Sequence, residues 1–239
     1  MGLVGIYSFP KSGNTWLRVI LGYLMQRDAL QIPDLHNQPL SDAEEYRGFR
    51  FFKHHGGQNF KVWNGQKLET THVIHIRRNP LDVFVSYLNF ISDNVTGTAP
   101  IKFASVDDIA GTDLFNLYFS TFITTGHVAI DFAYITGSYF ENNTFWMTQK
   151  EVPVILLKYE DLLSNALQNL APLRDLLQID DESIETALRQ AEIATRPDGK
   201  FFWKQREKNY AQYLTQEQID LFVKYRGDES LSLGYSFDS

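Results

Sequence analysis

The stretch GIYSFPKSGNTW, residues 5–16, decides the fold, because a buried strand turns there into a polar loop and then into a helix. The apolar run 3–9 is typical of a short buried strand, and apolar residues recur at helical spacing over 16–25. A loop between a strand and a helix exposes free backbone N–H groups at the positive end of the helix dipole. Because this loop also contains a lysine and a glycine, we predict that it binds an anion.

Further strands are predicted at three apolar or aromatic runs, 49–54, 71–77 and 152–157. Asn79 and Pro80 end the third strand of the chain, since Asn can cap a helix and Pro can occupy its first position. Helical spacing continues from there to Ile91, and it recurs over 114–149 with an interruption near 124–126, over 183–193 and over 216–225.

Strands that alternate with helices predict an α/β fold. We expect a P-loop-like three-layer α/β/α arrangement, with a central parallel sheet of about four to five strands flanked by helices. Active sites of such folds lie at the carboxyl ends of the strands. The 239 residues, of which 44% are hydrophobic, can bury one substantial core, so a single domain over 1–239 is expected.

Composition narrows the classes of function. The net charge of −7 argues against sequence-independent nucleic-acid binding, which needs a basic surface. There is no cysteine, no secretory signal and no apolar stretch of about 18 residues, so we expect a cytoplasmic protein that does not span a membrane. A small anion needs only local cations, and the chain has three sets of them: Lys11; Arg77 with Arg78; and Lys200, Lys204, Arg206 and Lys208.

The loop differs from the standard phosphate-binding pattern G-x-x-x-x-G-K-[ST]. Lys11 precedes Gly13 instead of following it, and no Lys-Ser/Thr pair stands at the helix start to organise Mg²⁺. This points away from an ATPase or kinase, and no metal site is expected.

Two long motifs resemble those of the sulfotransferase family. YSFPKSGNTWLR, residues 7–18, resembles the 5′-phosphosulfate-binding loop, usually written Tyr-Pro-Lys-Ser-Gly-Thr-Thr-Trp. RRNPLDVFVSYLNF, residues 77–90, is similar to the family's 3′-phosphate-binding segment, and weaker likeness in FFKHH, GSYFENNTFW and VILLKYEDL extends it from residue 3 to about 225. The stretch FFWKQREKNYAQYLT departs from the family's C-terminal lid, and the dimerisation pattern is not met near Thr215, so the oligomeric state stays open.

The resemblance implies a soluble, cytosolic-type enzyme, which we expect to be of bacterial type. Such an enzyme transfers a sulfuryl group from 3′-phosphoadenosine 5′-phosphosulfate (PAPS) to a hydroxyl or amine of a small molecule and leaves PAP as the product. The loop would cradle the 5′-phosphosulfate, Trp16 would stack on adenine, and Arg78 and Ser86 would bind the 3′-phosphate. The implied loop residues are Lys11, Ser12, Gly13, Asn14 and Thr15, and the implied second contacts to the nucleotide are Tyr159 and Lys204 or Arg206.

Lys53 and His55 match the family's Lys-x-His pattern. The resemblance makes His55 the general base that takes the acceptor proton, a task suited to a side chain that titrates near neutrality. Lys53 would neutralise charge on the transferring oxygens, and Lys11 would stabilise the leaving oxygen. The reaction would be an in-line displacement without metal.

Two other functions stay open. A P-loop nucleotide kinase would need a carboxylate after a hydrophobic strand, for which Asp161 is a weak candidate. In a non-catalytic nucleotide-binding protein of the same fold, Lys53 and His55 would be dispensable. The sequence does not fix the acceptor.

Some notable residues have ordinary structural explanations. Arg77 is expected to be a solvated strand end, and Asp82 is expected to cap or orient the following helix. On a strand, His72 and His75 point to opposite faces and do not form a metal pair. An aromatic series at helical spacing is expected to be core: Phe115, Tyr118, Phe119 and Phe122.

Overall fold

The computed structural model describes residues 1–26, 32–58, 60–128, 133–195 and 206–237. Its main sheet has the strand order β2-β3-β1-β6-β7. The four parallel strands are β1 (Gly2–Tyr7), β3 (Phe49–His54), β6 (His72–Arg77) and β7 (Val154–Lys158), and the short edge strand β2 (Glu45–Tyr46) runs antiparallel to β3. The predicted α/β fold is confirmed, with one antiparallel strand added.

Strand β1 lies between β3 and β6, and its last residue is in register with residues of both neighbours. Tyr7 pairs with His54 on one side and with His75 on the other. The loop that follows β1 therefore leaves the sheet between the carboxyl ends of β3 and β6, which is where ligands of parallel sheets bind.

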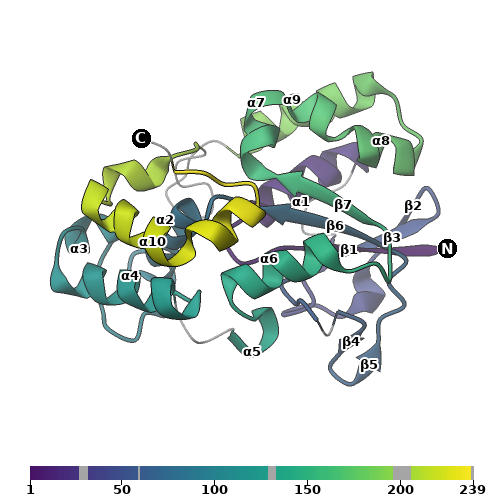
Figure 1. Cartoon of the computed structure of the whole chain (residues 1–239). Coiled ribbons are helices and arrows are strands. Elements are labelled where there is room, and N and C mark those ends of the chain that lie inside the picture. Colours follow the sequence, from purple (N-terminus) through teal and green to yellow (C-terminus); the bar gives the residue numbers. More distant parts are fainter. Residues whose placement is uncertain (27–31, 59, 129–132, 196–205, 238–239) are drawn as a thin grey trace.

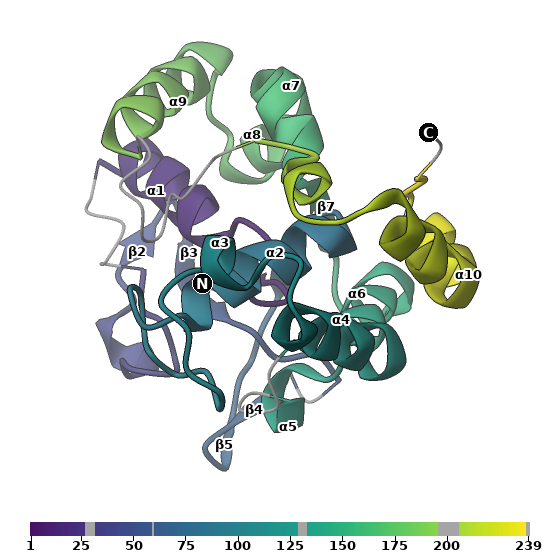
Figure 2. The same cartoon turned by 90° about the vertical axis from the view of Figure 1, so that its left-hand side faces the viewer.

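Helices cover both faces of the sheet (Figures 1 and 2). One face carries α1 (Asn14–Leu24), α7 (Tyr159–Asn169), α8 (Ala171–Leu177) and α9 (Asp181–Ala194). The opposite face carries α6 (Tyr139–Thr148). Beyond the carboxyl ends of the strands lie α2 (Pro80–Ile91), α3 (Val106–Ile109), α4 (Asp113–Thr125) and α10 (Gln216–Ser232).

Short elements complete the described chain. They are the 3₁₀ helices η2 (Leu40–Asp42) and η3 (Asn209–Gln212), the helix α5 (Ala133–Thr136), and a hairpin of β4 (Val62–Trp63) and β5 (Gln66–Lys67). No helix within the described ranges is long and apolar enough to cross a membrane.

Successive side chains of a central strand pack into two different cores, one on each face of the sheet. Val4 and Ile6 of β1 pack into the core beneath α1 and α9, whereas Tyr7 packs on the other face against Trp146 of α6, with ring centroids 4.4 Å apart. A strand buried on both faces reads as a continuous apolar run, which explains why these strands were predictable.

The aromatic series of α4 is core, as predicted. Phe115, Tyr118, Phe119 and Phe122 are all buried, and three of them lie within 5.5 Å of the Phe84 ring, centroid to centroid. This cluster fixes α2 against α4 and so positions the helix that follows β6.

At the junction of β6 and α2, the prediction for Asn79 is confirmed, whereas the expectations for Asp82 and Arg77 need correction. Asn79 caps the helix through its side-chain oxygen, with Pro80 in the first turn, as predicted. Asp82 is not a cap: its carboxylate accepts a hydrogen bond from the backbone N–H of Tyr210 at 2.9 Å. Arg77 is only partly solvated: the residue is half-buried, and its Nε and Nη1 are buried without a hydrogen-bond partner among the described residues.

Candidate active site

The loop after β1 has an unusual backbone. Lys11 has a φ of 68° and Gly13 a φ of 102°, both in the left-handed region that L-residues rarely adopt. A Cβ on Gly13 would lie 2.6 Å from the Tyr159 ring, so only glycine fits there. Such strain at a loop that opens a helix is typical of a ligand-binding turn.

Both neighbouring strands hold this loop by hydrogen bonds. His55, which follows β3, places its Nδ1 at 2.9 Å from the carbonyl oxygen of Ser8. Arg78, which follows β6, donates from Nη1 to the carbonyl of Lys11 at 3.5 Å. The strand order thus brings the predicted base, the loop lysine and the predicted 3′-phosphate arginine to one edge of the sheet.

Lys11 lies in a cationic environment. Burial, followed by the charges of Arg78 and Lys53, lowers its pKa to about 8. Its Nζ lies 4.4 Å from the centroid of the Phe90 ring. Ser86 is four residues before Phe90 and shares its face of α2, so this face is turned toward the loop.

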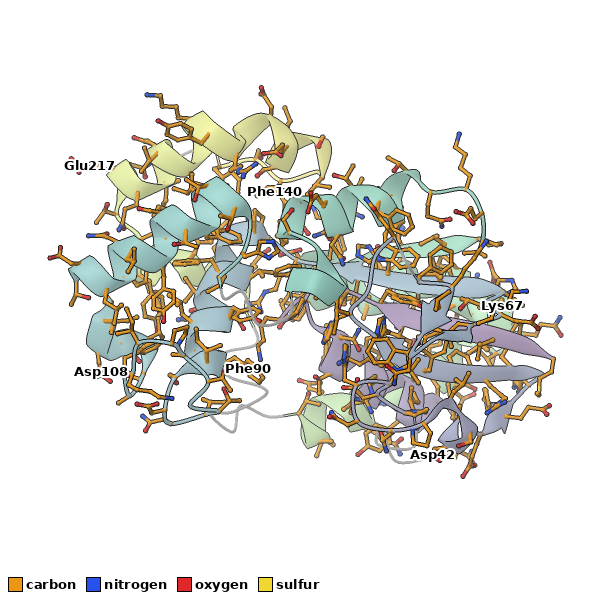
Figure 3. All side chains as sticks on the ribbon, turned by 90° about the horizontal axis from the view of Figure 1, so that it is seen from below. Asp42, Lys67, Phe90, Asp108, Phe140 and Glu217 are labelled. Atoms are coloured by element: carbon orange, nitrogen blue, oxygen red, sulfur yellow. The ribbon has the colours of Figure 1, made fainter. Side chains whose placement is uncertain are left out.

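Figure 3 shows Phe90 toward the middle of the molecule, whereas Asp108 and Glu217 lie at its periphery.

Arg78 is 8% exposed and its guanidinium lies over the ring of Tyr159, 4.4 Å from the centroid. Its Nη2 donates to the carbonyl of Arg206 at 3.2 Å, while Nε has no partner among the described residues. The hydroxyl of Ser12 is also buried and without a partner there. Two buried donors without an acceptor at an anion-type loop are an observation that favours a bound anion.

Lys53 forms an ion pair that the sequence did not suggest. Its Nζ lies 2.7 Å from Oδ2 of Asp34, and Lys53 is 8% exposed. Burial lowers the pKa of Lys53, and the charge of Asp34 opposes this effect.

His55 is held in one orientation. If Nδ1 carries the proton, it donates to the carbonyl of Ser8 and leaves the lone pair of Nε2 available as a base. Burial, and then the charge of Lys53, lowers the pKa of His55 well below its usual value. The expectation that His55 titrates near neutrality is therefore wrong: at neutral pH its imidazole is neutral and can accept a proton.

Two more histidines adjoin His55. The ring of His36 stacks on His55 with centroids 5.6 Å apart and on His54 at 4.8 Å. Burial lowers the pKa of His54 to about 3. Sequence reasoning did not select His36, which comes from an irregular segment without periodicity.

A pocket of about 380 Å³ lies next to the backbone of His55. Asn142 lines the pocket and donates to the carbonyl of His55 at 3.2 Å. His54, Gly57, Trp63, Thr136 and Glu141 also line it.

The remaining predicted residues are placed less uniformly. Asn14 is buried and donates to the Ser8 hydroxyl at 3.1 Å, whereas Thr15 is exposed. Trp16 is partly buried, with its ring edge-to-face on Tyr159 at 5.6 Å. The guanidinium of Arg206 bonds to Asn209. Lys204 lies outside the described residues.

Similar solved structures share the fold at low sequence identity. A mouse sulfotransferase, SULT7A1 complexed with PAP, matches with a TM-score of 0.68 and 16% identity over 98% of this chain and 87% of that one. Retinol dehydratase in complex with androsterone and inactive cofactor PAP matches with a TM-score of 0.65 and 16% identity, over 98% and 82%. Retinol dehydratase with retinol and PAP gives 0.69 and 15%, over 99% and 83%.

No curated protein sequence matches the chain significantly. The sulfotransferase domain family model matches residues 4–229, which is nearly the whole chain. The chain therefore belongs to the sulfotransferase domain family.

Proposed function

We propose that this chain transfers a sulfuryl group from PAPS to a hydroxyl or amine of a small-molecule acceptor, with His55 as general base and no metal. The observation that carries the proposal is the strained loop after β1, which His55 contacts from one side and Arg78 from the other. PAPS supplies the activated sulfuryl group.

The chain offers donors and positive charge for a nucleotide with two anionic ends. The loop residues 11–15 and the first turn of α1 face one end, with the Ser12 hydroxyl available as a donor. Arg78, whose Nε has no partner within the described ranges, and Ser86 on the loop-facing side of α2 are placed to hold a second phosphate. Trp16 and Tyr159 supply aromatic surface for the base. Arg206 adjoins this group through its backbone carbonyl, and Lys204 is proposed from the sequence alone.

The proton of the acceptor would go to His55. The bond from Nδ1 to the Ser8 carbonyl fixes the ring and its tautomer, so Nε2 is the accepting atom. The charge of Lys53 acts on both His55 and Lys11. The two lysines would stabilise the negative charge that develops on the transferring and leaving oxygens.

The pocket beside His55 is the proposed acceptor site. His54 and Gly56, the neighbours of His55 in the chain, line the pocket. Asn142 also lines it and donates a hydrogen bond to the carbonyl of His55. Its volume of about 380 Å³ lies toward the small end of the range for ligand pockets, which favours a compact acceptor.

Calorimetry tests the nucleotide site. We expect adenosine 3′,5′-bisphosphate to bind at least about tenfold more tightly than AMP, because Arg78 adds a charge-assisted contact to the 3′-phosphate. Arg78→Met should remove this preference. Equal affinity for the two nucleotides in the unaltered protein would rule out the 3′-phosphate assignment.

A second experiment separates the enzyme from a nucleotide-binding protein without catalysis. His55→Ala should lower turnover by roughly two or more orders of magnitude, with labelled PAPS and a panel of acceptors, while PAP affinity stays nearly unchanged. His72→Ala is the matched control, because His72 lies at the opposite end of the sheet, in β6. Full activity of His55→Ala would show that His55 is not the general base. A strict requirement of the activity for Mg²⁺ would favour a kinase instead.

A further inference from the structure

The segment that contains Asp34 lies alongside the carboxyl end of β3. This segment pairs with Lys53 as an additional strand would: Lys53 N–H donates to the carbonyl of Pro33 at 2.8 Å, and Leu35 N–H donates to the carbonyl of Lys53 at 3.1 Å. These two backbone bonds fix the side chains of Asp34 and Lys53 side by side, which gives the 2.7 Å ion pair.

The charges around Lys53 are mostly positive. Arg18 of α1 acts against its ammonium, and the charge of Lys53 in turn acts on Lys11 of the loop and on His36 and His55. Within the described part of the chain, Asp34 is the carboxylate that pairs with this lysine. A lysine that is 8% exposed and faces cations loses its proton easily unless a carboxylate stabilises the charge.

Asp34 also connects Lys53 to the base. Its Oδ1 accepts a hydrogen bond from the backbone N–H of His36 at 3.2 Å, and the His36 ring stacks on His55. One carboxylate therefore contacts the lysine directly and adjoins the histidine through a single intervening residue.

We propose that Asp34 is a positioning residue for sulfuryl transfer, which keeps the ammonium of Lys53 charged and fixed where the transferring oxygens will lie. The proposal rests on the proposed function and deepens it, because it names a residue outside the two motifs that resemble the family. Asp34 does not touch the reacting atoms; it acts through Lys53.

Asp34→Asn tests the charge while it retains the size of the side chain. We expect kcat to fall about tenfold or more at neutral pH, as for loss of a buried charge contact, while the PAP dissociation constant changes less than about threefold. The deficit should grow as pH rises and shrink as pH falls, because Lys53 without Asp34 is deprotonated at a lower pH. Asp34→Glu, which keeps the carboxylate, should restore most of the rate.

Asp93→Asn is the matched control. Asp93 pairs with Lys102 at 3.7 Å in an exposed ion pair, so its loss should leave the rate and its pH dependence unchanged. A second control is the Lys53→Met background, in which Asp34→Asn should cause no further loss if Asp34 acts only through Lys53.

An NMR titration of the Lys53 side chain tests the proposal without any activity. The resonance is assigned by its loss in Lys53→Met, and its midpoint should move to lower pH in Asp34→Asn. An unchanged midpoint, an equal loss of rate in both Lys53 backgrounds, or a faster Asp34→Asn enzyme would overturn the proposal. If the unaltered protein transfers no sulfuryl group while the midpoint moves as expected, the proposed function has failed and the Asp34–Lys53 coupling stands.

Discussion

Nucleotide binding should draw protons onto Lys11. Burial and the charges of Arg78 and Lys53 disfavour the ammonium of Lys11 and lower its pKa to about 8. A phosphosulfate or phosphate beside the amine has the opposite effect and returns the pKa to its usual range or above. For a free pKa of about 8, binding should take up ~0.1 proton at pH 7, ~0.5 at pH 8 and ~0.9 at pH 9.

Because proton uptake by Lys11 is coupled to nucleotide binding, the affinity for PAP should depend on pH. Since the bound form needs the ammonium, the apparent dissociation constant of PAP should weaken about tenfold between pH 7 and pH 9. Titration calorimetry in buffers of different ionisation enthalpy measures the proton uptake directly. Lys11→Arg is the control: it keeps the positive charge at every pH, so it should bind PAP without proton uptake and with a flat pH dependence.

Two results would refute this reasoning. Uptake close to zero at pH 9 in the unaltered protein would mean that Lys11 is already fully protonated before the nucleotide binds. Equal uptake in Lys11→Arg would assign the proton to another group, such as Lys53.

Three further predictions concern stability and are read from urea unfolding. Gly13→Ala should cost at least about 2 kcal/mol, since a positive φ and a clash with the Tyr159 ring combine. It should cost more than Gly48→Ala, where φ is 81° but no atom of a described residue lies within 4 Å of the added Cβ. Equal costs would discount the clash. Trp146→Phe should cost about 1–3 kcal/mol, because Nε1 of Trp146 donates to the carbonyl of Gly56 at 3.2 Å and the substitution leaves that carbonyl without its donor. An unchanged stability would mean that water replaces this hydrogen bond. His54 and His75 have folded pKa values of about 3, below the unfolded value of 6.5. The free energy of unfolding that they contribute is therefore present above about pH 6.5 and is lost as pH falls toward 3; at pH 5.5 each histidine should already have lowered it by about 1.4 kcal/mol. A His75→Asn protein should lose less stability on acidification than the unaltered one.

The parallel strands could be predicted because each is a run of mainly apolar residues, and β1, β3 and β6 are largely buried on both faces. The run 49–54 matches β3 to the residue, and the others differ by one or two residues at their ends. Strands β2, β4 and β5 escaped prediction, because two residues carry no periodicity. Their pairing is set by neighbours in the fold and not by local pattern.

The candidate site divides in the same way. The loop at 8–13, Lys53, His55 and Arg78 lie in local motifs that the sequence displays. Asp34 escaped notice, because its pairing with Lys53 depends on a bridge between segments 19 residues apart, one of them irregular. The guanidinium of Arg77 lies beside Gly234, more than 150 positions later in the chain, and no local sequence pattern reports this contact.

Arg78 has a consequence for how the protein is made. One guanidinium bonds to the carbonyl of Lys11 and to that of Arg206, while Asp82 binds the N–H of Tyr210. The ribosome delivers the first of these partners early and the last ones only near the end of synthesis. A nascent or prematurely terminated polypeptide that lacks the part from 206 to 210 would carry both recognition motifs, yet it would leave the arginine without its second anchor.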